Sequence, residues 1–139
     1  MTAGRVQAPC PAESPGEVSR QYAARWLARD AVALAALWVA DGEVITAAGA
    51  VWDGRPAIEA GFDAGFQAEF QRARLVTGKG WQRSLSPDLV LARQRFVVSG
   101  HLLPDGQDAQ RYATLCGFTL LRGDAGWQIV SLQMTASYG

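Results

Sequence analysis

A change in the apolar period near residue 72 limits the fold of this chain more than any other feature. From there to the C-terminus apolar and polar residues alternate, which is the period of a strand with one buried face. Turn-forming residues interrupt the alternation at Ser86-Pro87-Asp88, at Pro104-Asp105-Gly106 and from Gly123 to Gly126. The pattern predicts four strands joined as an antiparallel meander, over about 73–84, 88–101, 109–122 and 126–135.

Before residue 72 the apolar spacing is helical. Three large residues share one helix face at a spacing of four: Val18, Tyr22 and Trp26. The pair Ser14-Pro15 is a common start for a helix, because the serine caps it and the proline suits its first turn. We therefore expect a first helix over about residues 15–29.

A second, shorter helix is expected directly after the first. Asp30 is placed to cap it, and Leu34 and Trp38 recur at helical spacing. The pair Asp41-Gly42 is expected to end this helix.

A small hairpin and a third helix are expected next. The segment 43–52 contains the turn pair Ala48-Gly49. Pro56 fits the first turn of a following helix, and Asp53 is placed to cap it. Four apolar residues on that helix are spaced by four, which favours the core over a cofactor site: Ile58, Phe62, Phe66 and Phe70.

Composition limits the classes of partner that the chain is expected to bind. The chain has 139 residues with 13 basic and 13 acidic side chains, so net charge gives no case for nucleic acid. No run of about 18 apolar residues or signal peptide is evident, so we expect a cytoplasmic protein that does not enter a membrane. Cys10 and Cys116 are expected to be free thiols. No cysteine–histidine cluster predicts a metal, and no cofactor is expected.

Three short motifs recur in a recognisable order: Ala36-Leu37-Trp38 with Asp41-Gly42, then Gly54-Arg55-Pro56-Ala57-Ile58, then Gly126-Trp127-Gln128-Ile129-Val130. With the order of helices, hairpin and meander, they resemble the nuclear-transport-factor-two-like superfamily of cystatin-like α+β proteins. Within it, the chain is most similar to bacterial SnoaL-like and SgcJ/EcaC-type small proteins. The resemblance covers about residues 17–135.

The resemblance implies an α+β cone. A curved, mostly antiparallel sheet is wrapped around a long N-terminal helix, with three helices in all and a pocket at the open end. One such domain is expected over residues 16–139, after a flexible arm over residues 1–15. Members include ketosteroid isomerases, polyketide cyclases, dehydratases and dioxygenase subunits, and also proteins that only bind or dimerise, so the fold does not fix the function.

The resemblance makes Tyr22 a candidate catalytic residue. The isomerase tyrosine falls on Tyr22, where a phenol in an apolar cone could donate to an oxyanion. The alternative is a core aromatic with its hydroxyl near the rim. The isomerase aspartate base falls on Thr46, which cannot act as that base at neutral pH, so steroid-isomerase chemistry is disfavoured.

His101 is the second candidate catalytic residue and is the only histidine. Histidine is the usual general base near neutral pH, although a solvated position beside the following turn is the alternative. Gln133 stands where many relatives place a histidine. It is expected either at the pocket mouth or in a sheet-edge or dimer contact, and on one strand face with Trp127 and Ile129.

Large aromatic side chains exceed what the core of a small domain needs, which favours an apolar binding pocket. The expected ligand-binding residues are Trp26, Trp52, Phe62, Phe66, Trp81, Phe96, Tyr112, Thr114 and Gln133. We expect a homodimer that binds a hydrophobic small molecule. If it is an enzyme, cofactor-free isomerisation, cyclisation or dehydration is the expected class. The alternative is a non-catalytic dimerisation or partner-binding module of the same fold.

Overall fold

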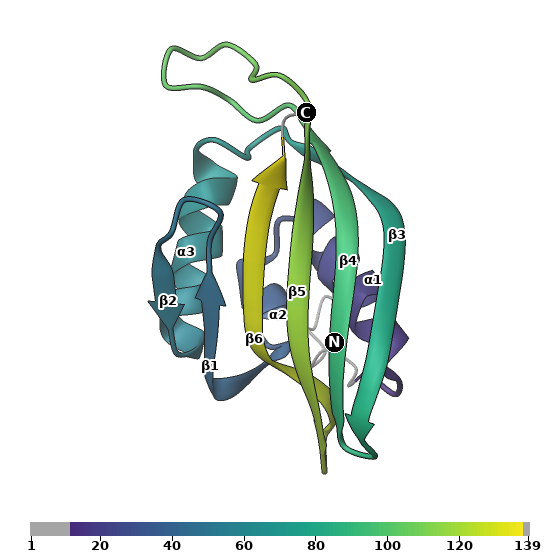
Figure 1. Ribbon diagram of the computed structural model, residues 1–139. Coiled ribbons are helices and arrows are strands. Elements are labelled where there is room, and N and C mark those ends of the chain that lie inside the picture. The colour runs from purple at the N-terminus through teal and green to yellow at the C-terminus, as the bar shows by residue number, and fades with distance from the viewer. Residues whose placement is uncertain (1–11, 138–139) are drawn as a thin grey trace, which may run out of the picture.

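The computed structural model describes residues 12–137. The helices are α1 (Pro15–Leu27), α2 (Ala31–Ala35) and α3 (Arg55–Gln67). The strands are β1 (Trp38–Ile45), β2 (Val51–Asp53), β3 (Arg74–Ser86), β4 (Leu89–Ser99), β5 (Tyr112–Gly123) and β6 (Gly126–Ser137). They form one sheet in the order β2-β1-β6-β5-β4-β3, in which only the β1–β6 pair is parallel (Figure 1). The predicted α+β class and mostly antiparallel sheet are confirmed.

The curved sheet has one face covered by helices and one face open. Figure 1 shows α1 and α2 behind the sheet and α3 beside β1 and β2. On β4 the buried side chains alternate, with Val90, Phe96 and Val98 facing the helices. This alternation is the period predicted from the sequence, and it places the core between the sheet and α1.

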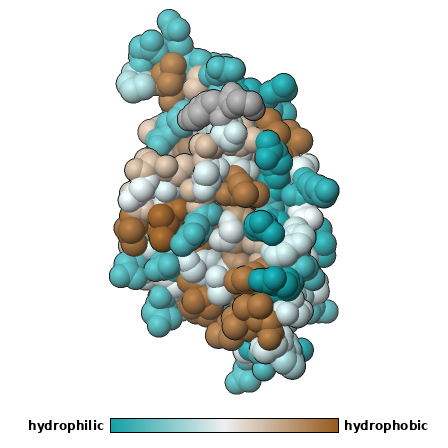
Figure 2. Space-filling model, viewed as in Figure 1, coloured by the Kyte–Doolittle hydropathy of each residue, from teal (hydrophilic) through white to brown (hydrophobic). Residues whose placement is uncertain are grey.

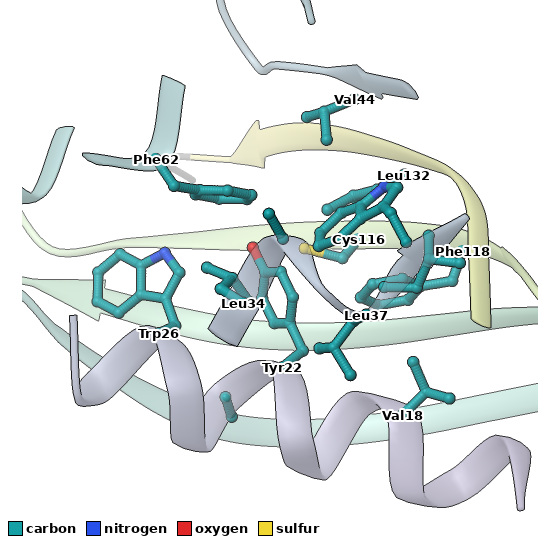
Figure 3. Close-up of a cluster of buried hydrophobic side chains, with 14 of the residues drawn as sticks. Val18, Tyr22, Trp26, Leu34, Leu37, Val44, Phe62, Cys116, Phe118 and Leu132 are labelled. Carbon is teal, nitrogen blue, oxygen red and sulfur yellow. The ribbon is translucent and has the colours of Figure 1, made fainter. Parts of the chain in front are cut away.

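The core is an aromatic and aliphatic cluster around α1. Figure 3 shows Val18, Tyr22 and Trp26 pointing from one side of α1 toward the sheet, as the spacing by four predicted. Val18 is 1% exposed and Trp26 is 5% exposed. Burial of such side chains is the main stabilising contribution, at about 25 cal/mol for each Å² of apolar surface removed from water.

The second helix is shorter than predicted. Asp30 caps it as expected, because Asp30 Oδ1 accepts a hydrogen bond from Ala33 N at 3.0 Å. The helix ends at Ala35, and Trp38 begins β1 instead of continuing the helical face. Trp38 is fully buried, and its indole nitrogen donates to the Glu43 carbonyl at 3.1 Å. Burial of the Trp38 side chain against the sheet outweighs the helical preference that its spacing from Leu34 indicated.

The start of α3 differs from the prediction in its cap. Gly54 is the capping residue, and no side chain, including that of Asp53, bonds to the free amides of the first turn. Gly54 has a φ of 91°, a conformation that favours glycine. Pro56 lies in the first turn, as predicted.

A bulge in β6 reverses which face its side chains use. Leu120 of β5 pairs with Ile129, but the neighbouring Thr119 pairs with Ser131, so one residue of β6 is extra. Ile129 and Leu132 are therefore both buried. The prediction that Ile129 and Gln133 share a face was wrong, and Gln133 is exposed.

The boundaries of the strands after residue 72 follow the predicted turns, except that the connection between β4 and β5 is longer than predicted. The chain between β4 and β5 is a long connection over residues 100–111 that contains the predicted turn at Pro104. The predicted flexible arm falls largely on residues 1–11, which lie outside the described range together with Cys10. Ala12 is buried, and its carbonyl accepts a hydrogen bond from Trp127 N at 2.9 Å. No helix within residues 12–137 is long and apolar enough to cross a membrane.

Candidate ligand-binding site

A cavity of about 700 Å³ lies between α1, α3 and the concave face of the sheet. Its wall is mostly apolar and contains several aromatic rings, and α1, α3, β2 and β4 contribute Trp26, Phe62, Phe66, Trp52 and Phe96. The β1–β2 turn, the end of α3 and the 100–111 connection lie at one end of the cone (Figure 1). Cavities of about 300–1,000 Å³ with apolar walls and a few polar groups are typical of small-molecule sites.

Tyr22 places a hydroxyl group inside this cavity. Its side chain is 3% exposed, and its ring packs against Phe96 and Phe118 with centroids at 5.7 and 5.5 Å. Figure 3 shows the oxygen pointing away from α1 toward the space between Trp26, Phe62 and Cys116. No residue in the described range forms a hydrogen bond with that hydroxyl. The cavity therefore contains a buried polar group that a guest could satisfy.

The protonation of the inner groups is set by burial. Burial raises the pKa of Tyr22 well above 10, and the nearby Cys116 thiol raises it further. Burial also raises the pKa of Cys116 to about 12, although a hydrogen bond with Thr114 partly opposes this. Both groups stay protonated near neutral pH, so Tyr22 is a hydrogen-bond donor and Cys116 is not a thiolate nucleophile.

A histidine and a tyrosine meet at the mouth of the cone. His101 Nδ1 lies 2.7 Å from the Tyr112 hydroxyl oxygen, within hydrogen-bond distance. The Phe70 ring packs edge-on against the imidazole with centroids at 4.8 Å. Both polar side chains line the cavity and are partly buried. His101 is therefore partly shielded from solvent.

The backbone around His101 is held from two sides. The His101 carbonyl accepts a hydrogen bond from Ala109 N at 2.7 Å, and Leu102 N donates to the Glu69 carbonyl at 2.8 Å. Gly100 has a φ of 77°, and a Cβ there would lie 2.9 Å from the Arg72 carbonyl oxygen. These contacts hold the backbone at His101 close to the end of α3.

Comparison with solved structures identifies the architecture. An uncharacterised protein with a cystatin-like fold from Caulobacter vibrioides superposes with a TM-score of 0.81, at 18% identity over 88% of this chain and 87% of that one. LinA gives 0.80, at 15% identity over 88% and 83%. A nuclear-transport-factor-two-like protein with a cystatin-like fold from Novosphingobium aromaticivorans gives 0.71, at 27% identity over 88% and 79%. The chain has the cystatin-like fold. The resemblance seen in the sequence is confirmed at the level of the fold.

No protein-family model and no curated protein matched the sequence. The cystatin-like fold hosts different functions, so it does not choose among them for this chain. Arguments about function must therefore start from the cavity itself.

The cystatin-like cone brings together most of the predicted site residues. The cavity is lined by Tyr22, Trp26, Trp52, Phe62, Phe66, Phe96, His101, Tyr112 and Thr114. Thr46, which replaces the isomerase aspartate, lines it too. Gln133 does not, because the bulge in β6 turns it outward.

Trp81, which the sequence analysis placed among the ligand-binding residues, does not line this cavity. It pairs with Arg93 across β3 and β4, and the Arg93 guanidinium lies 3.9 Å from its ring centroid. A register shift between Thr77 and Gly80 sets the face on which Trp81 emerges. Local alternation could not show this shift.

Several lining residues were not predicted as site residues. Glu69, Phe70, Cys116 and Met134 line the cavity, together with Ala136 at the end of β6. Cys116 shares a strand face with Tyr112 and Thr114, so alternation could have included it. Among the described residues, no group of three or more His, Cys, Asp or Glu side chains is arranged to hold a metal ion.

Proposed function

We propose that the protein binds an apolar, largely aromatic small molecule in the cone, with an oxygen atom of the ligand at Tyr22. The observation that carries this proposal is the buried Tyr22 hydroxyl without a partner among the described residues. Burying a hydroxyl without a hydrogen bond costs about 1–3 kcal/mol. A ligand carbonyl or ether oxygen would accept from Tyr22 and offset that cost.

If the ligand is turned over, the class is cofactor-free acid–base chemistry such as isomerisation, cyclisation or dehydration. A neutral Tyr22 is suited to donate to an oxyanion, because its raised pKa keeps the proton on the phenol. His101 is the group suited to move a proton.

Binding is tested with a matched pair of probes. Chalcone carries one carbonyl between two phenyl rings, and trans-stilbene has a similar shape without it. We expect Tyr22→Phe to weaken chalcone binding by roughly 5- to 30-fold, the equivalent of about 1–2 kcal/mol, and to leave stilbene binding unchanged. Affinities are measured by quenching of tryptophan fluorescence and by calorimetry.

Two controls locate the binding. Trp81→Phe changes an aromatic side chain outside the cavity and should alter neither affinity. Met134→Trp adds bulk to the cavity wall and should weaken both probes. The proposal fails if neither probe binds at millimolar concentration, or if both bind the Met134→Trp variant as well as the parent protein.

A second proposal concerns the outer face of the sheet, which we propose to be the contact surface of a homodimer. Four large apolar residues are 41–59% exposed on β3 and β5: Val76, Trp81, Leu115 and Leu121. Figure 2 shows apolar patches between hydrophilic side chains on this face. Exposed apolar patches of this kind mark interaction surfaces.

Charge favours a second copy as the occupant of this face. Arg93 and Arg95 lie on β4, and neither forms an ion pair with a residue in the range 12–137. Glu43 lies on β1, at the other half of the same face, beside Ser131. A twofold axis parallel to the strands, lying over the middle of the outer face, would place β1 of one copy over β4 of the other, so the charges would meet.

The dimer is tested by sedimentation velocity between about 1 and 100 µM. Leu115→Glu puts a charge in the centre of the outer face and should give a monomer, whereas Val32→Glu on exposed α2 should not. A parent protein that is monomeric throughout that range refutes the dimer. A dimer that binds no probe would favour the alternative, a non-catalytic dimerisation module.

A further inference from the structure

The polar groups of the cavity are divided between two ends. The inner end has the Tyr22 hydroxyl and the Cys116 thiol among aromatic rings. The mouth has His101, Tyr112 and Glu69. Aromatic side chains, including Phe62, Phe66 and Phe96, form the wall between them. A ligand that forms hydrogen bonds with the polar groups at both ends of the cavity would have an apolar middle part and an oxygen atom at each end.

The polar groups at the two ends of the cavity differ in whether they can exchange a proton near neutral pH. Burial raises the pKa of Tyr22 and of Cys116, so the inner groups keep their protons near neutral pH. Histidine is the side chain that ordinarily exchanges a proton in that range. His101 is the only histidine of the chain and lies at the mouth. Proton exchange with a bound ligand therefore belongs at the mouth and not at the inner end.

Resting on the proposed function, we infer that the ligand carries a weakly acidic hydroxyl group, a phenol or an enol, at the cone mouth, and that His101 takes its proton. Tyr112 is the positioning residue. In the tautomer in which Nδ1–H donates to the Tyr112 oxygen, the lone pair of Nε2 is the proton acceptor. No hydrogen bond joins Nε2 to any side chain of the described range.

The step balances without another reagent. The O–H bond of the ligand breaks, its electron pair stays on the oxygen, and an N–H bond forms at Nε2. The product is an ion pair between a phenolate or enolate and an imidazolium, in which Nδ1–H still donates to Tyr112. His101 and Tyr112 are only partly buried, so the loss of hydration that opposes such an ion pair is smaller at the mouth than at the inner end.

Charged neighbours of His101 come from three segments. Glu69, after the end of α3, lines the same mouth and is exposed. Arg72 and Asp108 neutralise each other in an exposed ion pair at 3.1 Å. Tyr112 on β5 and the uncharged Phe70 complete the surroundings. Among these groups, Glu69 alone carries a charge that forms no ion pair with another described residue.

The test follows the ionisation of a bound phenol directly. The probe is 4-hydroxychalcone, whose absorption moves to longer wavelength when the phenol ionises, and 4-methoxychalcone is its non-ionising counterpart. We expect the bound hydroxyl probe to ionise at a pH at least one unit lower than in water, which is a tenfold change in its acid constant. His101→Asn keeps an amide near the place of Nδ1 but cannot take a proton, and it should abolish the shift. Tyr112→Phe should reduce it.

The outcomes separate this inference from the proposed function. The methoxy probe has no proton to give, so its bound absorption should not change with pH in the parent protein or in His101→Asn. Tyr22→Phe should weaken both probes and leave the ionisation shift in place. A hydroxyl probe that binds with no shift, or with the same shift in His101→Asn, overturns the inference and leaves the cavity as a binding site. If neither probe binds, the proposed function itself fails.

Discussion

Gly61 is expected to leave room for the Trp52 ring to pack against α3, and Gly61→Ala tests this. Gly61 lies within α3, and a Cβ built on it would lie 2.4 Å from Cε2 and 2.5 Å from Cδ2 of Trp52. These are ring atoms, and ordinary contacts begin near 3.4 Å. The indole must therefore move by about an ångström, although it also packs against Phe62 with centroids at 5.1 Å.

Two opposing effects set the magnitude. In a helix interior, alanine is more favourable than glycine by about 0.8–1 kcal/mol. Overpacking a filled site costs about 1–3 kcal/mol. The clash is with a ring system and not with the end of a flexible chain, so we expect it to win. The net loss of unfolding free energy is about 1 kcal/mol, or roughly 3 °C in Tm for a domain of this size.

The assay is urea unfolding followed by circular dichroism, arranged as a double-mutant cycle. In a Trp52→Leu background the clash is gone, so Gly61→Ala should stabilise the protein by about 0.5–1 kcal/mol. The coupling energy between the two positions is then about 2 kcal/mol. If Gly61→Ala stabilises the parent protein as much as it stabilises the Trp52→Leu variant, the packing of Trp52 against α3 is not as described.

Three further predictions concern stability and reactivity. The pKa of Tyr22 is raised in the folded protein, so above about pH 10 only the unfolded chain releases this proton. The free energy of unfolding should therefore fall as pH rises through that range. Tyr22→Phe should make this fall less steep in unfolding experiments run from pH 8 to 11. In a Cys10→Ser variant, Cys116 should not react with a thiol reagent at pH 8 until urea unfolds the protein, and fast labelling of folded protein would contradict its burial. Asp30→Ala removes the side-chain hydrogen bond to Ala33 N and should lower the free energy of unfolding by about 1 kcal/mol, measured by urea unfolding. Asp53 forms no capping hydrogen bond, so Asp53→Ala should lower it by less than half as much.

The sequence predicted the elements whose signals are local. The spacing of Val18, Tyr22 and Trp26 located α1 to within two residues at its end, and the turn at Pro87 located the β3–β4 hairpin. Nine of the predicted site residues line one cavity, because alternation along β4 and β5 is regular where Phe96 and Thr114 lie. Their roles in binding remain predictions.

The errors have one physical source. Trp38 has helical spacing but enters a strand, because a parallel partner more than 90 residues later in the chain pairs with it at Ile129. Gln133 and Trp81 follow irregularities in strand register, and one extra residue reverses every side chain after it. Register is decided between strands, so a single strand's sequence does not contain it.

The position of β6 has a consequence for how the chain reaches this shape. β6 lies between β1 and β5, and it is the only strand other than β2 that hydrogen-bonds to β1. During synthesis, β1 and β2 must wait for residues 126–137 before they join the rest of the sheet. The two halves of the cone are thus joined by β6, which is made after the other five described strands, and contacts across such long separations form slowly. The cavity wall includes Met134, Thr135 and Ala136 of β6, so the complete cavity forms only after β6 has joined the sheet.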